Sequence, residues 1–190
     1  MSRTKKNYSR LLGEPRAEEL INRIIRVDHA GEYGAKRIYD GQLAILGKSD
    51  VGDELREMAM AEERHLETFK KMIVERRVRP TALMPIWQIA GFVLGAGTAL
   101  LGREAAMACT VAIEEVIEEH YADQSAQLDT LQGKEAEPEL KRIIDEFRVE
   151  EIEHRDIALD NNAEQVPGYP LLTSAIKTGS RLAIWLSERV

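Results

Sequence analysis

The chain has 190 residues, 44% of them hydrophobic and 5% aromatic, so it is long enough for one well-buried core and rich in residue types that favour helix. Its formal net charge of −7 argues against a nucleic-acid-binding protein, which normally carries a basic patch. The single cysteine, Cys109, excludes both a disulfide framework and a cysteine zinc site within one chain.

We expect a basic, flexible tail over residues 1–15 and a single domain over residues 16–190. The tail is too short to be a secretory signal, and it lacks the apolar core that such a signal contains. Glycines and prolines divide the rest into helix-length pieces, and no stretch alternates with period two for long enough to form a strand. The sequence therefore predicts an all-α fold, with helices over about 16–47, 50–78, 103–131, 137–163 and 170–188.

Residues 80–102 form a segment of a different kind, because they carry no charge over a length close to the roughly 20 residues that cross a bilayer. Three alternatives remain open: a transmembrane helix with Gly91 and Gly95 as its contact face, a buried connector, and a helix lying in the membrane interface. Trp87 and the flanking arginines favour the interfacial helix. We therefore expect an apolar, membrane-docking insert at about 80–102.

Two stretches share the pattern Glu-x-x-His: Glu62 with His65, and Glu151 with His154. In a helix these side chains project from one face, about 60° apart. At about 100° per residue, each pair falls in the middle of an otherwise apolar stripe. Buried glutamate is costly unless it is paired or bound to a metal, so the pattern predicts a metal site.

Two further helices each supply one carboxylate from the centre of an apolar stripe, Glu32 on the first and Glu114 on the third. Glu115 and Glu119 point away from the Glu114 stripe and are expected to be solvated. Glu118 lies only about 40° from the Glu114 direction and is a reserve candidate.

One Glu from each of two helices and one Glu-x-x-His from each of two others is the ligand set of ferritin-like di-iron and di-manganese bundles. Carboxylates can bridge two hard cations, and imidazole adds a neutral nitrogen donor suited to iron. The competing interpretation is a purely structural bundle. The predicted metal ligands are Glu32, Glu62, His65, Glu114, Glu151 and His154.

Four polar residues near these stripes are candidates for supporting roles around the ligands. Asp28, His120 and Tyr121 could hydrogen-bond to a ligand, and His29 could be a similar partner. For each of them the simpler interpretation is an ordinary hydrogen-bonded residue at the edge of the core.

Several motifs together resemble the demethoxyubiquinone hydroxylase family. They are Val27–Gly34 (VDHAGEYG), Glu62–His65, Ala108–Glu115 (ACTVAIEE), Glu151–His154 (EIEH), the apolar block Gly91–Gly102 and Leu186–Arg189 (LSER). The resemblance covers nearly the whole chain from about Arg16 onward.

The resemblance implies a ferritin-like fold and a monooxygenase that hydroxylates the quinone ring of a demethoxyubiquinol in ubiquinone biosynthesis, using O2. It implies two iron ions per chain, held by the six residues predicted above, and NADH as the ultimate reductant, although the sequence contains no nucleotide-binding motif. The expected partners are a polyprenyl quinol, a membrane surface and other ubiquinone-biosynthesis proteins, with no nucleic acid. The expected location is the cytoplasmic face of a bacterial inner membrane, or alternatively the matrix face of the mitochondrial inner membrane.

Two rival functions would require different sequence features from those found in this chain. A ferritin-type iron oxidase or store would use nearly the same ligands but would not need an uncharged insert. A non-catalytic, membrane-associated helical bundle would need neither both Glu-x-x-His pairs nor the two lone glutamates.

Overall fold

The computed structural model describes residues 16–190, which fold into α-helices joined by short connections and contain no strand. The α-helices are α1 (Ala17–Leu46), α2 (Gly52–Glu75), α3 (Met84–Leu100), α4 (Arg103–Asp129), α5 (Pro138–Asp160) and α6 (Tyr169–Ser187), with short 3₁₀ turns at Gly133–Glu135 and Ala163–Gln165. The prediction of an all-α fold is confirmed, and the predicted helix ends differ from the observed ones by a few residues. The predicted tail at residues 1–15 lies outside the described residues.

Prolines stand at the starts of three helices. Pro85, Pro138 and Pro170 occupy the first turn of α3, α5 and α6. A first-turn proline leaves no helical hydrogen bond unmade, and its fixed φ suits the helix. Pro85 therefore begins the helix of the apolar segment and does not interrupt it.

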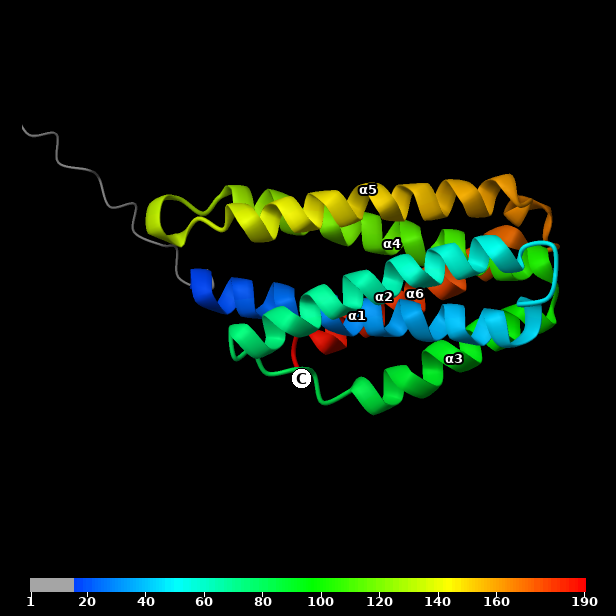
Figure 1. Ribbon diagram of the computed structural model, residues 1–190, viewed down its shortest axis with the longest axis horizontal. Helices are drawn as coiled ribbons and strands as arrows, with labels where there is room; N and C mark the ends of the chain where they lie inside the picture. The colour runs from blue at the N-terminus through cyan, green and yellow to red at the C-terminus, as the bar shows by residue number, and fades with distance from the viewer. Residues whose placement is uncertain (1–15) are drawn as a thin grey trace, which may run out of the picture.

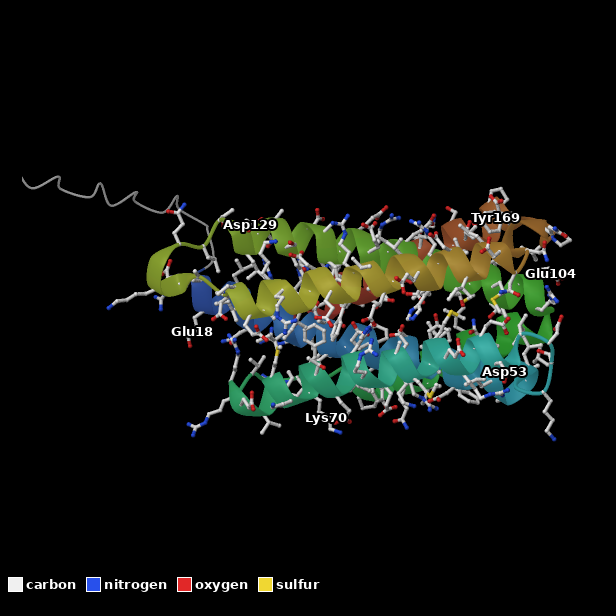
Figure 2. The ribbon with its side chains drawn as sticks, turned by 45° about the horizontal axis from the view of Figure 1, so that its top comes forward. Glu18, Asp53, Lys70, Glu104, Asp129 and Tyr169 are labelled. Atoms are coloured by element: carbon white, nitrogen blue, oxygen red, sulfur yellow. The ribbon has the colours of Figure 1, made fainter. Side chains whose placement is uncertain are left out.

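The helices α1, α2, α4 and α5 run side by side along the long axis of the molecule (Figure 1). One apolar cluster, including Ile24, Phe69 and Ile144, fills one end of this bundle. A second, including Leu55, Met107 and Ala158, fills the other end. Charged side chains such as Lys70 and Asp129 lie on the outside (Figure 2). The stretch between the two apolar clusters is where the polar residues of the predicted stripes lie.

The helices α3 and α6 cover α1 and α4 on the outside of the bundle. Ile38 of α1 and Ile113 of α4 form a third apolar cluster with Ile176 of α6, and Leu94 of α3 packs against it. The indole N–H of Trp87 donates a 3.0 Å hydrogen bond to the hydroxyl of Ser187, which ties the start of α3 to the end of α6.

Two glycines let α3 approach α1 closely. A Cβ at Gly91 would lie 2.8 Å from the carbonyl oxygen of Gly34, and a Cβ at Gly95 would overlap the carbonyl oxygen of Ile38. The sequence correctly marked Gly91 and Gly95 as a contact face, but their partner is α1 of the same chain.

The opposite face of α3 is apolar and exposed. Ile89 is 68% exposed and Val93 62%, and Ile86 and Leu100 are also exposed. The alternative of a buried connector is therefore wrong. Within residues 16–190 no helix is both long and apolar enough to cross a bilayer.

Candidate metal centre

Six acidic and histidine side chains converge in the middle of the bundle, with Glu32 from α1, Glu62 and His65 from α2, Glu114 from α4, and Glu151 and His154 from α5. Each is at most 6% exposed. The helical stripes aim them inward, because positions three and four residues apart share one face of a helix. All six residues predicted from the stripes are brought together.

The six side chains form two overlapping groups that could each hold a metal ion. One group is Glu32, Glu62, His65 and Glu151, and the other is Glu62, Glu114, Glu151 and His154; within each group the ligand atoms lie within 4.8 Å of one another. Both groups contain Glu62 and Glu151. The arrangement therefore has two glutamates shared between the groups, and one further glutamate and one histidine belonging to each.

Five of the eight carboxylate oxygens in this cluster accept no hydrogen bond. Both oxygens of Glu62 accept none, and neither do Glu32 Oε2, Glu114 Oε2 and Glu151 Oε1. Burying an ionised carboxylate without partners is strongly unfavourable, so native proteins pair such groups or let them bind cations. These unpartnered oxygens, together with two imidazoles, fit a pair of divalent metal ions.

The histidine nitrogens lie against the same carboxylates. His65 Nδ1 is 3.1 Å from Glu151 Oε1 and 3.5 Å from Glu32 Oε2, and His154 Nδ1 is 3.2 Å from both Glu62 Oε1 and Glu151 Oε2. Both rings therefore turn Nδ1 toward the centre of the cluster, which is the orientation that a metal ligand requires.

The protonation behaviour of the cluster follows from its burial and crowding. Burial raises the pKa of Glu32 and of Glu114 well above the usual value. Burial by itself lowers the pKa of each histidine, but the adjoining carboxylates outweigh it and raise the pKa of His65 to about 12 and that of His154 to about 11. The pKa of Glu151 falls to about 2 because the two histidines outweigh its burial. Without a metal, the cluster therefore holds protons that metal ions would displace.

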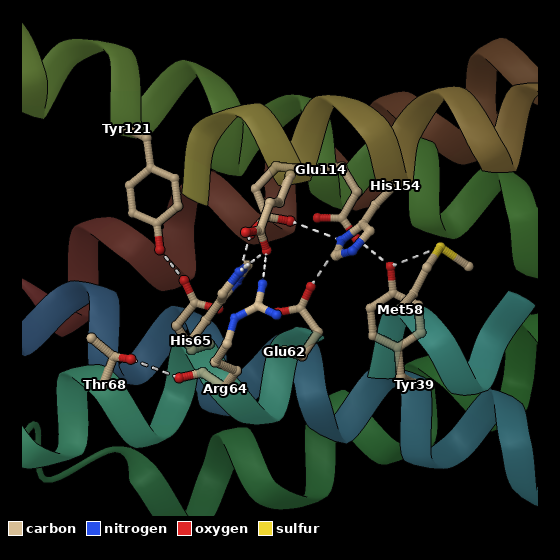
Figure 3. Close-up of polar contacts among 12 residues, drawn as sticks. Tyr39, Met58, Glu62, Arg64, His65, Thr68, Glu114, Tyr121 and His154 are labelled. Carbon is tan, nitrogen blue, oxygen red and sulfur yellow. Dashed lines mark hydrogen bonds and ion pairs between the residues drawn. The ribbon is translucent and has the colours of Figure 1, made fainter. Parts of the chain in front are cut away.

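Two tyrosines hold the outer glutamates from opposite ends of the cluster (Figure 3). The hydroxyl of Tyr39 donates a 2.5 Å hydrogen bond to Glu114 Oε1, and the hydroxyl of Tyr121 donates one to Glu32 Oε1. Tyr121 was among the predicted supporting residues. Tyr39 was not among them, since periodicity places a ring on a face of the helix but does not say where its hydroxyl points.

Glu150 contacts His65, and the sequence did not predict this contact. Its Oε2 lies 2.8 Å from the outer nitrogen of His65, Nε2, and also pairs with Arg64. Glu150 directly precedes Glu151 and is rotated by about 100° from it on α5, so it falls outside the apolar stripe. Only the packing of α5 against α2 brings it to the histidine.

Asp28 and His120 lie in a separate buried polar group. Gln124 donates a 2.6 Å hydrogen bond to Asp28 Oδ1, and its amide nitrogen lies 2.8 Å from His120 Nε2. Asp28 Oδ2 accepts no hydrogen bond. Asp28 therefore does not orient a metal-ligand candidate through a hydrogen bond. His29, whose pKa is lowered by burial, has an Nδ1 without a hydrogen bond.

Three other glutamates of α4 each pair with a basic residue outside the cluster. Glu118, the reserve candidate, lies 2.5 Å from Arg148 of α5. Glu115 pairs with Lys177 and Glu119 with Arg181, both on α6. Of the acids in this stretch of α4, only Glu114 enters the cluster, as its stripe predicted.

These features define a class: an all-helical protein in which four helices bring six buried Glu and His side chains together in groups that could bind metal ions. Residues 19–187 match the family model described as "Ubiquinone biosynthesis protein COQ7". The chain belongs to this family, which confirms the resemblance seen in its motifs.

Three curated relatives carry related names. A Rhodospirillum rubrum protein named 3-demethoxyubiquinol 3-hydroxylase is 57% identical, over 95% of this chain and 84% of the relative. A human protein named NADPH-dependent 3-demethoxyubiquinone 3-hydroxylase, mitochondrial, is 55% identical, over 90% and 78%. A Saccharomyces cerevisiae protein named 5-demethoxyubiquinone hydroxylase, mitochondrial, is 40% identical, over 90% and 78%.

Proposed function

We propose that this protein is a di-iron monooxygenase of ubiquinone biosynthesis that hydroxylates the quinone ring of a demethoxyubiquinol with O2. The observation that carries the proposal is the pair of overlapping Glu and His groups that share Glu62 and Glu151. The names of relatives that are 40–57% identical supply the substrate class. The fold corresponding to this function is a single ferritin-like domain over residues 16–190.

The proposed ligands are Glu32, Glu62, His65, Glu114, Glu151 and His154. When bound, two iron ions would supply the activation of O2 for insertion of one oxygen atom into the substrate ring. Four carboxylates would balance the charge of two divalent ions, and Glu62 and Glu151, which belong to both groups, would help to hold both ions. The other two glutamates are held by tyrosine hydroxyls, which limits their movement when charge changes nearby.

The exposed apolar face of α3 is the proposed membrane-docking surface. A helix that packs one face on the bundle and turns an apolar face outward can bury that outer face in the membrane interface without spanning the bilayer. Docking would bring the polyprenyl tail of the substrate alongside the bundle. We place the protein at the cytoplasmic face of a bacterial inner membrane, or alternatively at the matrix face of the mitochondrial inner membrane.

The reductant is proposed to be a reduced nicotinamide nucleotide. The family resemblance implies NADH, whereas the names of the mammalian relatives specify NADPH. Other ubiquinone-biosynthesis proteins are proposed as partners.

Metal analysis and product analysis test the activity. Purified protein loaded with ferrous iron should hold about two irons per chain. With O2, a reductant and demethoxyubiquinol, mass spectrometry should show a product heavier by one oxygen atom. Iron binding without this product would favour an iron oxidase or store, and a folded chain that binds no metal would refute the metal centre.

Vesicle co-sedimentation tests the docking surface independently. Ile89→Glu and Val93→Glu should reduce binding to liposomes, because they place charge on the exposed face of α3. Val74→Glu is the matched control, since Val74 is 73% exposed but lies on α2. Equal loss of binding in all three variants would contradict docking through α3.

A further inference from the structure

The two histidines of the metal centre differ in what contacts their outer nitrogens. His65 Nε2 lies 2.8 Å from Glu150 Oε2. His154 makes its hydrogen bond and both ion pairs through Nδ1, and within residues 16–190 its Nε2 has no hydrogen-bond partner. The two proposed metal positions are therefore not equivalent, although each has one histidine.

We propose that Glu150 is a positioning residue that fixes the ring and tautomer of His65 and thereby makes the His65 side the tighter of the two metal positions. This inference rests on the proposed di-metal function. It concerns a side chain that is not itself a member of either metal-binding group.

The hydrogen-bonding chemistry of imidazole supports this role. A neutral imidazole carries one proton, and whichever nitrogen donates it leaves the other with a lone pair for a metal. Glu150 accepts the hydrogen bond from Nε2–H, so when a metal ion displaces the second proton of His65 the free lone pair would stand on Nδ1, which faces Glu32 and Glu151. A carboxylate behind a ligating histidine also raises its basicity and hence its affinity for the metal.

The surroundings of His65 hold this geometry in place. Its ring stacks on Phe147 with centroids 3.8 Å apart, so it has little room to turn. Glu150 is held in turn by Arg64, the residue before His65 on the same helix. The three side chains connect α2 to α5 beside the cluster.

His154 lies in a more open setting. With Arg64, Glu150 and Glu153 it lines a surface pocket between α2 and α5, whereas His65 does not reach this pocket. A ligand with no carboxylate behind it and a pocket beside it should release its metal sooner than His65 does.

Stepwise metal release from the full-length, metal-loaded protein tests the proposal. The chain is loaded with Co²⁺, and loss of its absorption is followed after a strong chelator is added. The wild type should release one ion quickly and one slowly. In Glu150→Ala the slow ion should leave about 10–100 times faster, with the fast ion unchanged.

Matched variants make the result specific. Glu153→Ala removes the same charge from an exposed position on the same helix, near the same pocket, and should leave both rates unchanged. Glu150→Gln keeps the volume of the side chain and an acceptor oxygen, so it should fall between the wild type and Glu150→Ala. In a His65→Ala background, Glu150→Ala should have no further effect, because its action passes through the imidazole.

Three results would overturn the proposal: unchanged release in Glu150→Ala, equal acceleration of both ions, or an undiminished effect in the His65→Ala background. Failure of the underlying metal centre looks different, because the wild type would then bind no Co²⁺ before any variant is compared. Failure of the hydroxylase activity alone would appear as iron binding without the hydroxylated product and would leave the release rates as predicted.

Discussion

At the scale of single residues, the cluster gathers buried carboxylates whose charge must be offset by protons or by metal ions. Four glutamates lie within one buried volume, and both oxygens of Glu62 accept no hydrogen bond. Such an arrangement lowers stability unless a ligand compensates for it, so function and not folding explains these side chains.

Replacing Glu114 separates the metal role from the structural one. Glu114→Ala should lose about one metal ion per chain and reduce hydroxylation to background, because one of the two groups loses its own glutamate. Helical content should be retained, since the change removes a buried carboxylate and introduces a good helix former. Iron analysis, circular dichroism and product analysis check this.

Glu115→Ala is the control for that change. Glu115 is the neighbouring residue on α4 but pairs with Lys177 outside the cluster. A half-exposed pair of this kind outside the cluster contributes little, so iron content and turnover should stay near the wild-type values. Normal turnover in Glu114→Ala would refute its assignment as a ligand.

Asp28 offers a prediction about stability that does not involve metal. Burial raises its pKa well above the usual value, although the hydrogen bond from Gln124 opposes this. Asp28→Asn should therefore increase the free energy of unfolding at neutral pH, by about 1–3 kcal/mol, because the buried charge disappears while the acceptor for Gln124 remains.

The stability gained in Asp28→Asn should depend on pH. A carboxyl group with a raised folded-state pKa costs stability as pH rises above its unfolded value, here 3.8. The gain from Asp28→Asn should therefore be larger at pH 7.5 than at pH 5 in urea unfolding of the metal-free chain. A gain that does not change with pH would show that Asp28 is not the source.

At the scale of helices, apolar periodicity predicted the long helices and the face that each presents to the core. It could do so because the proposed ligands and the core residues share one stripe of each helix, so the apolar neighbours of Glu62 and Glu151 predict that these two glutamates are buried. It could not predict Glu150 or the hydroxyl of Tyr39, because those contacts depend on how one helix packs against another. The sequence also could not predict that α3 packs on α1, since an uncharged segment with small residues can pack against a membrane, a second helix or a core.

The packing of α3 on α1 can be tested with two glycines of the same helix. In Gly95→Ala the new methyl group would overlap the carbonyl oxygen of Ile38, whereas a methyl group at Gly97 would have nothing within 4 Å. Gly95→Ala should therefore lower the melting temperature and expose the connections of α3 to limited proteolysis. Gly97→Ala should be neutral or stabilising by up to about 1 kcal/mol. Equal behaviour of the two variants would contradict close packing of α3.

At the scale of the whole molecule, metal binding and folding are expected to be coupled, because the proposed ligands come from four different helices. A ligand that binds only the folded state stabilises it by mass action, by about 2.7 kcal/mol at 100 times its dissociation constant. Removing the metal should therefore lower the melting temperature without changing the helical content at low temperature.

The size of that loss should grow with pH. In the metal-free protein, Glu32 and Glu114 have raised pKa values, so their cost to stability increases as pH rises above the ordinary carboxyl value of 4.5. His65 and His154, with pKa values of about 12 and 11, contribute stability that is complete below pH 6.5 and is lost as pH rises toward those values. Glu151, with a pKa of about 2, contributes a constant amount above pH 4.5.

The metal-free protein loses stability as pH rises, whereas metal ions oppose this loss. They replace the protons of the cluster, and their binding strengthens as pH rises. The gap in melting temperature between iron-loaded and chelator-treated protein should therefore be wider at pH 8 than at pH 6. Scanning calorimetry on both forms across this range measures the gap, with ionic strength held constant because exposed ion pairs also respond to salt. A gap that stays constant or narrows toward pH 8 would mean that protons and metal ions do not compete for these six side chains.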